Sequence, residues 1–421
     1  MATLSLLHRL LLDLIAPRPM IAEATVSALD PADWGRLLDM VRQHRLGPLL
    51  HWQLTRIRPG LPVPVAVRLE LEESFSQSAI RALVMRRELV LIHRLLTQAG
   101  IPYLAMKGAF LAFHAYPQPG LRPLGDLDIL LRAPDAVRAF EVLVAAGCVR
   151  PPQFCQGTPV AQLGVHKHLP ELITASGQAV IDLHSRLLAP DQSAGRCDPS
   201  EDPAFWSRGI TRPEGQDALC FTGPTDLLLH LVLHSTREHR FENGPLILSD
   251  IAYLLQSRSI DWAGFWQGAE RTGCRRACWL MLRLTAHYWG GQGIDWSAGG
   301  AEPPGLEQAM RRAAPLLLQG LEAPREDVYL THALGQRRSG ASRLVYLRRR
   351  VLPPRERMAA VYPVSERSPL LYLYYLVHLW RLLSRRLPQY VQFRRQAGIR
   401  ETLREVSEVV QWLEEPAQHP H

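Results

Sequence analysis

Two aspartates stand one residue apart at the front of a short apolar run, LRPLGDLDILLR (121–132). If this run is a strand, Asp126 and Asp128 point to one face and Leu127 points to the other. Two carboxylates held this close repel each other unless a cation lies between them or one of them is protonated. A divalent cation such as Mg²⁺ or Mn²⁺ removes the conflict, because these ions prefer oxygen ligands. Taken alone, the pattern is short and common, and two solvated aspartates at the mouth of a strand explain it more simply.

A third carboxylate favours a metal site over two solvated aspartates. The segment VIDLH (180–184) places Asp182 on another short apolar run, where an unpartnered charge is costly, and His184 falls on the same face. Three carboxylates on adjacent strands can hold two metal ions that bridge a triphosphate and activate an attacking hydroxyl. We therefore predict Asp126, Asp128 and Asp182 as metal ligands and catalytic residues, with Mg²⁺ or Mn²⁺ as cofactor. His184 is expected beside the nucleotide.

Only two of the 48 basic residues are lysines, and the first of them lies close to this pattern. Lys107 follows the buried run IPYLAM (101–106), and Gly108 opens the next helix, whose free N–H groups attract anions. Lys107 would add a point charge for a phosphate, and Arg122, in the loop before Asp126, could hold a second phosphate through two hydrogen bonds. A solvated surface lysine is the alternative for Lys107.

Two histidines flank the second lysine. His166 and His168 share one face of a predicted strand, and Lys167 lies on the other face. The turn that follows would bring the two histidines beside Asp182 and His184, where they could point at the site. Ordinary histidines at a strand end explain the pattern equally well.

Two further histidines fall on a predicted helix, LLLHLVLHSTREH (227–239). His230 and His234 lie four residues apart on one helix face, and Asp250 begins the next helical pattern. That spacing suits a metal-binding pair, but no H-E-x-x-H motif accompanies it. We expect instead a helical lid that faces the nucleotide, with a pair of hydrogen-bonded core histidines as the simpler alternative.

The elements that must position these residues are helices and short strands. Apolar residues at helical spacing predict a helical region over 1–98, with Asp30 as the N-cap of one helix. Strand, helix, strand, helix and hairpin follow over 99–190, which is typical of an α+β unit with a mixed sheet. We expect a linker over 191–224 and a second helical domain over 225–415.

The composition is that of an ordinary globular protein, because 47% of the 421 residues are hydrophobic and 21% are charged. Six cysteines without a C-x-x-C pair indicate reduced thiols in a cytoplasmic protein. The most membrane-like run, 368–383, is shorter than the roughly 20 residues that cross a bilayer. We therefore expect a core or interfacial helix there and no membrane span. The net charge of +8 suits an anionic partner, and the alternative is the general abundance of arginine that is common in proteins from GC-rich genomes.

Several segments together resemble the bacterial "uncharacterised nucleotidyltransferase" family of the polymerase-β-like nucleotidyltransferase superfamily: YLAMKGAFLAFHAYPQPGLRPLGDLDILL, GCVR, HKHLPELI and VIDLHSRL. The resemblance is strongest over 95–190 and continues loosely through LLLHLVLH and LSDIAYLL. It implies a catalytic palm, with Asp126 and Asp128 as the D-x-D pair and Asp182 as the third carboxylate. The superfamily usually carries Gly-Ser after its first strand, whereas this chain carries Lys-Gly at 107–108.

The expected reaction moves a nucleoside monophosphate from an NTP, with ATP as the first choice, to a hydroxyl acceptor, and it releases pyrophosphate. Lys107 and Arg122 would neutralise the phosphates, and Asp182, or His184 as second choice, would take the acceptor's proton. The acceptor could be a small molecule, a peptide, a protein or RNA. The alternatives are a nucleotide-binding or regulatory protein without catalysis, and an RNA-binding module that uses the Arg-rich segment 348–357.

Overall fold

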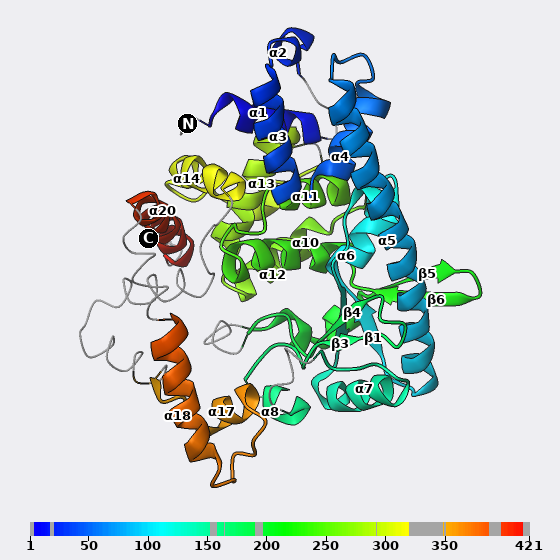
Figure 1. The fold of residues 1–421 in the computed structure, drawn as a ribbon, viewed down its shortest axis with the longest axis vertical. Coiled ribbons are helices and arrows are strands. Elements are labelled where there is room, and N and C mark those ends of the chain that lie inside the picture. The colour runs from blue at the N-terminus through cyan, green and yellow to red at the C-terminus, as the bar shows by residue number, and fades with distance from the viewer. Residues whose placement is uncertain are drawn as a thin grey trace.

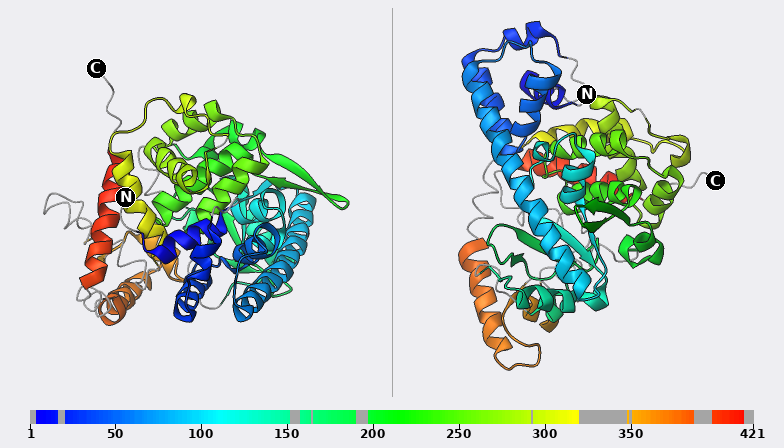
Figure 2. Two further views of the ribbon diagram at one scale, coloured as in Figure 1. Left: turned by 90° about the horizontal axis from the view of Figure 1, so that it is seen from above. Right: turned by 90° about the vertical axis from the view of Figure 1, so that its right-hand side faces the viewer.

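The computed structural model describes residues 4–16, 21–151, 158–163, 165–189, 197–291, 293–319, 348, 351–386 and 397–415. A mixed sheet is surrounded by helices that come from both ends of the chain (Figure 1). Two further views show the long helix α5 running along one side of the molecule, from the N-terminal helices down to the sheet (Figure 2). The combination of many helices with one mixed sheet confirms the predicted α+β class.

The sheet has six strands in the order β3-β4-β2-β1-β6-β5. β2 is parallel to β4 and β1 is parallel to β6, whereas the other three neighbouring pairs are antiparallel. The β3–β4 and β5–β6 pairs are joined by short turns, as antiparallel neighbours allow, and the parallel β2–β4 pair is joined through helix α7. The strands are β1 Tyr103–Ala105, β2 Leu127–Leu131, β3 Leu172–Ile173, β4 Val180–His184, β5 Ile210–Glu214 and β6 Asp217–Phe221.

Side chains alternate across the two central strands. Leu127, Ile129 and Leu131 of β2 point to one face and join the main hydrophobic core. Asp128 points to the opposite face, where it lies next to Asp182 of β4. Strand β2 is buried along its whole length, so the polar face is enclosed by other parts of the chain.

The N-terminal region consists of helices. Helix α3 begins after Asp30, whose side chain accepts a hydrogen bond from the backbone N–H of Asp33 at 2.7 Å, which confirms the predicted N-cap. The 34-residue helix α5 packs on α4, α7 and β6, and so ties this region to the sheet. The helices are α1 Leu6–Ile15, α2 Glu23–Ser27, α3 Pro31–Gln43, α4 Gly47–Trp52, the π-helix η1 Gln53–Ile57 and α5 Val65–Gln98.

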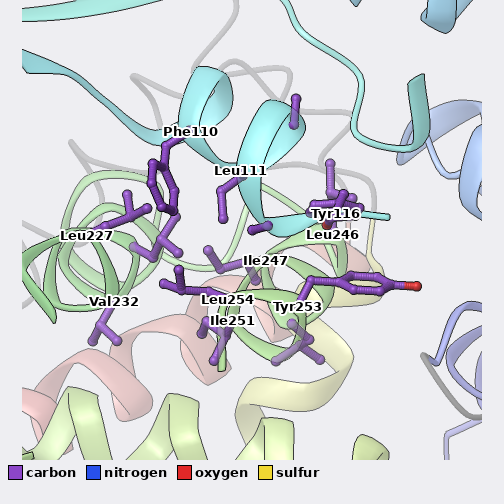
Figure 3. Packing of buried hydrophobic residues seen from close by; sticks show 14 of the residues in the cluster. Phe110, Leu111, Tyr116, Leu227, Val232, Leu246, Ile247, Ile251, Tyr253 and Leu254 are labelled. Atoms are coloured by element: carbon purple, nitrogen blue, oxygen red, sulfur yellow. The ribbon is translucent and has the colours of Figure 1, made fainter. Parts of the chain in front are cut away.

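The segment between β1 and β2 fastens the sheet to the second helical region. It forms a short helix followed by a wider π-helical turn, and its apolar side chains pack on α10 and α11 (Figure 3). Phe110 and Leu111 are fully buried there, opposite Leu227 and Ile247. The elements are α6 Lys107–Phe110, η2 Leu111–Ala115, the 3₁₀ turn η3 Pro119–Leu121, α7 Ala133–Ala145, α8 Pro159–Leu163, α10 Pro224–Leu233, the π-helix η6 His234–Glu238 and α11 Leu246–Ser257.

The rest of the chain adds more helices, and none of the helices in the described part of the chain is long and apolar enough to cross a membrane. In the Arg-rich segment 348–357, Arg348, Arg355 and Arg357 are exposed, whereas Arg349 and Arg350 lie outside the described residues. The remaining elements are α12 Trp262–Arg271, α13 Arg275–Trp289, the 3₁₀ turn η7 Ser297–Gly299, α14 Leu306–Leu318, α17 Arg355–Val361, α18 Leu371–Arg381, the π-helix η8 Leu382–Arg386 and α20 Ala397–Glu414.

The stretch expected as a linker, 191–224, contains ordered structure that the sequence did not suggest. Residues 191–196 lie outside the described residues, but the 3₁₀ turn η5 (Pro199–Glu201), helix α9 (Pro203–Ser207) and strands β5 and β6 follow. Of the Pro and Gly residues that favoured a linker, Pro199 and Pro203 begin η5 and α9. Pro213 lies in β5, and Gly215 lies in the turn of the β5–β6 hairpin with a positive φ of 61°. Of the strand expected over 166–174, only β3 and a bridge between His168 and His184 form.

The hairpin leads to a stability prediction. Phe221 ends β6, is fully buried, and packs against the rings of Phe110 and His114 at centroid distances of 5.8 and 4.9 Å. Phe221→Ala should lower the free energy of unfolding by about 3–5 kcal/mol, because it leaves a cavity between the sheet and α6. Chemical denaturation measures this. The exposed Ala218→Ser on the same strand should have no effect, and an unchanged Phe221→Ala protein would contradict the packing.

Candidate functional site

The pairing of β2 with β4 creates the first feature of the site. In the parallel register Asp128 lies opposite Asp182, so the two carboxylates are neighbours on one face of the sheet. Their side chains are only 11% and 18% exposed. Two neighbouring carboxylates that are shielded from water need positive charge close by.

His184 supplies part of that charge. Its Nε2 lies 2.9 Å from Asp128 Oδ1 and 3.2 Å from Asp182 Oδ2. Burial lowers the pKa of His184, but the two carboxylates outweigh burial and leave this pKa above its usual value. Burial likewise raises the pKa of Asp128 and Asp182, yet both pKa values end below their usual range. Lys107 and His184 lower the pKa of Asp128, and His184 lowers that of Asp182. The two carboxylates therefore favour the protonated form of His184, which lies between them.

Lys107 supplies the second positive charge. Its Nζ lies 3.4 Å from Asp128 Oδ1, and its side chain is 9% exposed. Burial lowers the pKa of Lys107, but Asp128 and then Glu238 raise it above the usual value, so the ammonium stays charged. The backbone of Lys107 has a positive φ of 35°, a conformation that costs a non-glycine residue about 1–2 kcal/mol. Such strain, held at the lysine that reaches the carboxylates, is typical of functional positions.

Asp126 stands in front of this buried pair. It precedes β2 and is exposed to solvent, in contrast to Asp128 and Asp182. Partial desolvation raises the pKa of Asp126, repulsion from Asp128 raises it further, and Lys107 opposes both effects. The three predicted carboxylates thus lie in one electrostatic cluster, with Asp126 at its open side.

These side chains suit a divalent cation. Asp128, Asp182 and His184 each offer one ligand atom, and the three atoms lie within 4.8 Å of one another. Among the described residues, Asp182 Oδ1 and His184 Nδ1 are buried without a hydrogen-bond partner. Carboxylate oxygens with an imidazole nitrogen are ligands that such ions accept, provided that His184 first gives up its proton. The residues therefore fit the predicted metal.

The histidines before β3 also lie at this site. His168 Nδ1 is 3.7 Å from Asp182 Oδ1, and its ring centroid is 5.7 Å from that of His184. Burial lowers the pKa of His168 despite the nearby Asp182, so this contact is polar rather than ionic near neutral pH. His166 stacks on His168 at a centroid distance of 6.2 Å, one ring further from the carboxylates.

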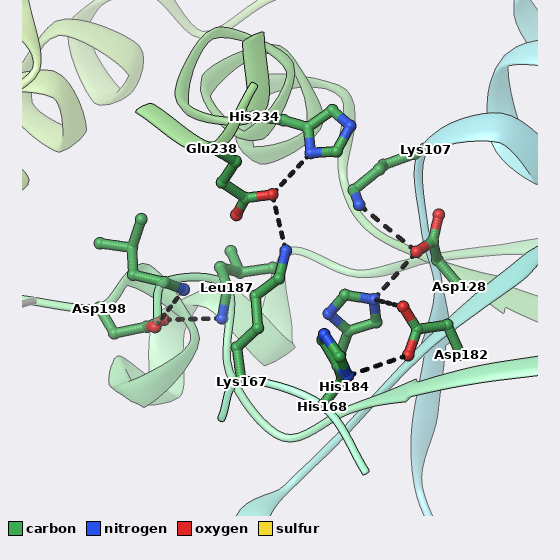
Figure 4. Close-up of polar contacts among 11 residues, drawn as sticks. Lys107, Asp128, Lys167, His168, Asp182, His184, Leu187, Asp198, His234 and Glu238 are labelled. Carbon is green, nitrogen blue, oxygen red and sulfur yellow. Dashed lines mark hydrogen bonds and ion pairs between the residues drawn. The ribbon is translucent and has the colours of Figure 1, made fainter. Parts of the chain in front are cut away.

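The helical region closes the opposite side of the site (Figure 4). His234 Nδ1 lies 2.7 Å from Glu238 Oε2, and the same oxygen accepts a hydrogen bond from Lys167 Nζ at 2.6 Å. Lys167 belongs to the segment that leads to β3, so this part-buried ion pair joins η6 to the sheet. His234, Glu238 and His239 form a second group whose ligand atoms lie within 4.8 Å of one another, but Glu238 is already paired with Lys167.

His230 lies deeper in the same helix. It is 2% exposed, and neither ring nitrogen has a hydrogen-bond partner among the described residues. Burial lowers the pKa of His230 well below its usual value, and the positive charge of Lys107 lowers it further. The same two causes bring the pKa of His234 to about 4. Both rings are therefore neutral, and they face the cationic side of the site without adding charge.

Arg122, expected to bind a phosphate, is engaged with another predicted residue. Its Nε and Nη2 donate hydrogen bonds to the carboxylate of Asp250 at 3.3 and 3.1 Å, and Tyr116 Oη donates to the same carboxylate at 2.7 Å. A Cβ added at Gly108 would lie 2.7 Å from Arg122 Nη1, so this glycine leaves room for the guanidinium. In this structure Arg122 and Asp250 join the loop before β2 to α11.

Sequence analysis missed two residues of the site, Glu238 and Tyr116. Glu238 follows His230 and His234 at intervals of four, so the three recur on one helical stripe, and that stripe was a usable signal. Glu238 is also the ion-pair partner of the second lysine, Lys167. Tyr116 gave no signal, because only the folded structure brings it to the carboxylate of Asp250.

The pair of Arg122 and Asp250 leads to a second stability prediction. Asp250→Ala leaves a buried guanidinium without its counter-charge, and the free energy of unfolding should fall by about 3–5 kcal/mol. Chemical denaturation measures this. Glu307→Ala, which removes an exposed ion pair with Arg311, should leave the stability unchanged. Equal stability of the Asp250→Ala and parent proteins would contradict the buried pair.

The neutral His230 leads to a prediction about pH. An unfolded histidine takes up a proton near pH 6.5, whereas His230 resists protonation in the fold. The free energy of unfolding should therefore fall as the pH drops below about 6.5, by up to about 1.4 kcal/mol per pH unit for this residue. In His230→Asn the dependence should be shallower between about pH 6.5 and 5, and parallel to the parent above about pH 7.5. Parallel curves throughout would show that His230 takes up its proton as readily in the folded as in the unfolded protein, and would contradict the lowered pKa.

Comparison with known proteins adds one match. Residues 30–290 match the model of a family described as "uncharacterised nucleotidyltransferase", and this range covers more than half of the chain and all the site residues named above. No curated protein and no solved structure gives a significant match. Membership of this family indicates nucleotide transfer in general terms. The chain belongs to the uncharacterised nucleotidyltransferase family.

Proposed function

We propose that this protein is a metal-dependent nucleotidyltransferase that moves a nucleoside monophosphate from an NTP to a hydroxyl acceptor and releases pyrophosphate. One observation carries the proposal most directly. In a chain of this family, the register of β2 and β4 places Asp128 against Asp182, and two cationic groups, Lys107 and His184, contact the pair. A polymerase-β-like palm, with ATP as the first nucleotide to test, belongs to the same proposal.

In this proposal Asp126, Asp128 and Asp182 would hold the Mg²⁺ or Mn²⁺. When bound, the metal supplies charge stabilisation for the triphosphate and lowers the pKa of the attacking hydroxyl. As a neutral imidazole, His184 would offer Nε2 to the same group of ligands, beside the nucleotide. Asp126, as the exposed carboxylate, faces the arriving nucleotide.

Transfer requires the acceptor oxygen to bond to the α-phosphorus while the bond to the pyrophosphate oxygen breaks. Lys107 keeps its ammonium beside Asp128 and balances the negative charge that grows on the leaving pyrophosphate. Asp182 Oδ1, which has no hydrogen-bond partner among the described residues, is the atom that we assign to take the acceptor's proton. His184 Nε2 is the second choice for that step.

The helical side is assigned to nucleotide enclosure. His230 and His234 are neutral and lie on the helices that face the carboxylates, and the part-buried ion pair between Lys167 and Glu238 fixes those helices to the sheet. We assign His166 and His168 to the rim beside Asp182. Arg122 supports this wall through Asp250, and it becomes a phosphate ligand only if that pair opens.

The proposal predicts which substitutions abolish transfer. The protein is incubated with each α-³²P-labelled NTP, Mg²⁺ or Mn²⁺ and a cell lysate. The labelled acceptor is measured, and the released pyrophosphate, which carries no label, is measured separately. Asp128→Asn and Asp182→Asn should each lower the rate at least about a hundredfold, because several kcal/mol of charge stabilisation are lost. Asp39→Asn changes an exposed aspartate that is not one of the site residues, and this variant should act like the parent.

Binding of a fluorescent NTP with metal completes that experiment. The parent and Asp39→Asn should bind it in a metal-dependent way, and the two site variants should bind it more weakly. Equal labelling of an acceptor by the parent and Asp182→Asn would refute the catalytic assignment. Equal metal-dependent nucleotide binding by all four proteins would refute the site itself.

A second candidate is a nucleotide-binding protein without turnover. It is favoured by one observation: His184 and Lys107 already balance the charges of Asp128 and Asp182. Metal-dependent nucleotide binding that is lost in Asp128→Asn, together with no release of pyrophosphate in any lysate tested, would select this candidate.

A further inference from the structure

Helix α18 carries two apolar stripes on opposite sides. The inner stripe packs on α17 and forms a small core with Leu371 fully buried against Met358 and Tyr362. The outer stripe consists of large apolar side chains that are each between 38% and 64% exposed. Its residues are Tyr372, Leu373, Leu376, Leu379 and Trp380 of α18 and Leu383 of the π-helix η8 that follows directly.

The outer stripe is continuous along the helix. Tyr372, Leu376, Leu379 and Leu383 recur at intervals of three and four residues, which places them on one side of a helix. Leu373 and Trp380 widen this side. A helix with an apolar stripe on each side needs two partners, and the structure supplies only the inner one among the described residues.

Positive charge is concentrated in the same stretch of the sequence. Residues 342–386 contain ten arginines against two glutamates, a net charge of +8 that equals the net charge of the whole chain. Of these, Arg355, Arg357, Arg367 and Arg381 are exposed and belong to α17, α18 or the turn between them. Arg355 donates a hydrogen bond to Tyr372 Oη at 2.7 Å, so cationic and apolar side chains are in direct contact.

We propose that the outer stripe of α18, with the surrounding arginines, binds the surface of a membrane rich in anionic phospholipids. An apolar helix face that carries Trp and Leu and is flanked by arginine is the pattern of a helix that lies in the membrane interface. With 11 residues the helix is too short to cross a bilayer, so it lies along the surface. Trp380 then sits at the level of the headgroups.

Two other partners fit less well. RNA would use the arginines, but four of the six stripe residues are leucines, which cannot stack on bases. A second copy of this chain would cover the leucines, but it would bring two segments of net charge +8 together. An anionic lipid surface satisfies the leucines and the arginines at once. The proposal is independent of the nucleotidyl-transfer proposal.

Sedimentation of the full chain with lipid vesicles tests the proposal. The protein should bind vesicles of equal parts phosphatidylcholine and phosphatidylglycerol at least about tenfold more tightly than pure phosphatidylcholine vesicles, and high salt should weaken the binding. The triple variant Leu373→Gln, Leu376→Gln, Trp380→Gln should lose at least about tenfold in binding. The matched control Ile80→Gln, Leu83→Gln removes apolar residues of equal exposure from α5 and should bind as the parent does.

Because all these positions are exposed, circular dichroism should show both variants folded. A second readout is the fluorescence of Trp380, obtained by subtracting the spectrum of Trp380→Phe from that of the parent. The emission maximum of this difference spectrum should shift to the blue on anionic vesicles only. Equal binding to neutral and anionic vesicles, or full binding by the triple variant, would overturn the proposal. Binding of single-stranded RNA without any binding of vesicles would also overturn it. So would a dimer, seen by sedimentation velocity, that dissociates in the triple variant, if the parent does not bind vesicles.

Discussion

The central constraint on this protein is the repulsion between two carboxylates that the sheet holds side by side. Asp128 and Asp182 are paired across parallel strands on a face that water barely reaches. Such a pair is stable only when positive charge balances it. In this structure His184 bridges both carboxylates and Lys107 reaches one of them, so the charges are matched within a few ångströms.

The surrounding fold makes that arrangement possible. β1 ends two residues before Lys107, whose strained backbone begins the helical segment that packs on α10 and α11. The part-buried ion pair of Lys167 with Glu238 and that of Arg122 with Asp250 fix the helical region against the sheet at two separate points. The site therefore lies where the two layers meet. The sheet side carries Asp128, Asp182 and His184, and the helical side carries the neutral His230 and His234 together with Glu238, which is paired with Lys167.

Local signals in the sequence were enough for much of this. The D-x-D spacing and the VIDLH run follow from the two-residue repeat of a strand, and Asp30 marks a helix start through its own side chain. Non-local facts were out of reach. The Pro- and Gly-containing stretch before Thr225 suggested a linker. Its strand β6 pairs with β1, which is distant in the sequence, so no local pattern reveals that pairing. Likewise, nothing in the spacing of Arg122 reveals that Asp250 will neutralise it.

The most direct measurement is a crystal structure of the protein with Mn²⁺ and a non-hydrolysable ATP analogue, with anomalous scattering used to locate the metal. The expected result is a manganese peak bound by Asp128 and Asp182, with the triphosphate beside Lys107. The same experiment on Asp182→Asn should show that peak weakened or lost. Manganese and triphosphate bound elsewhere on the molecule, with His184 still bridging the two carboxylates, would contradict the assignment of this site.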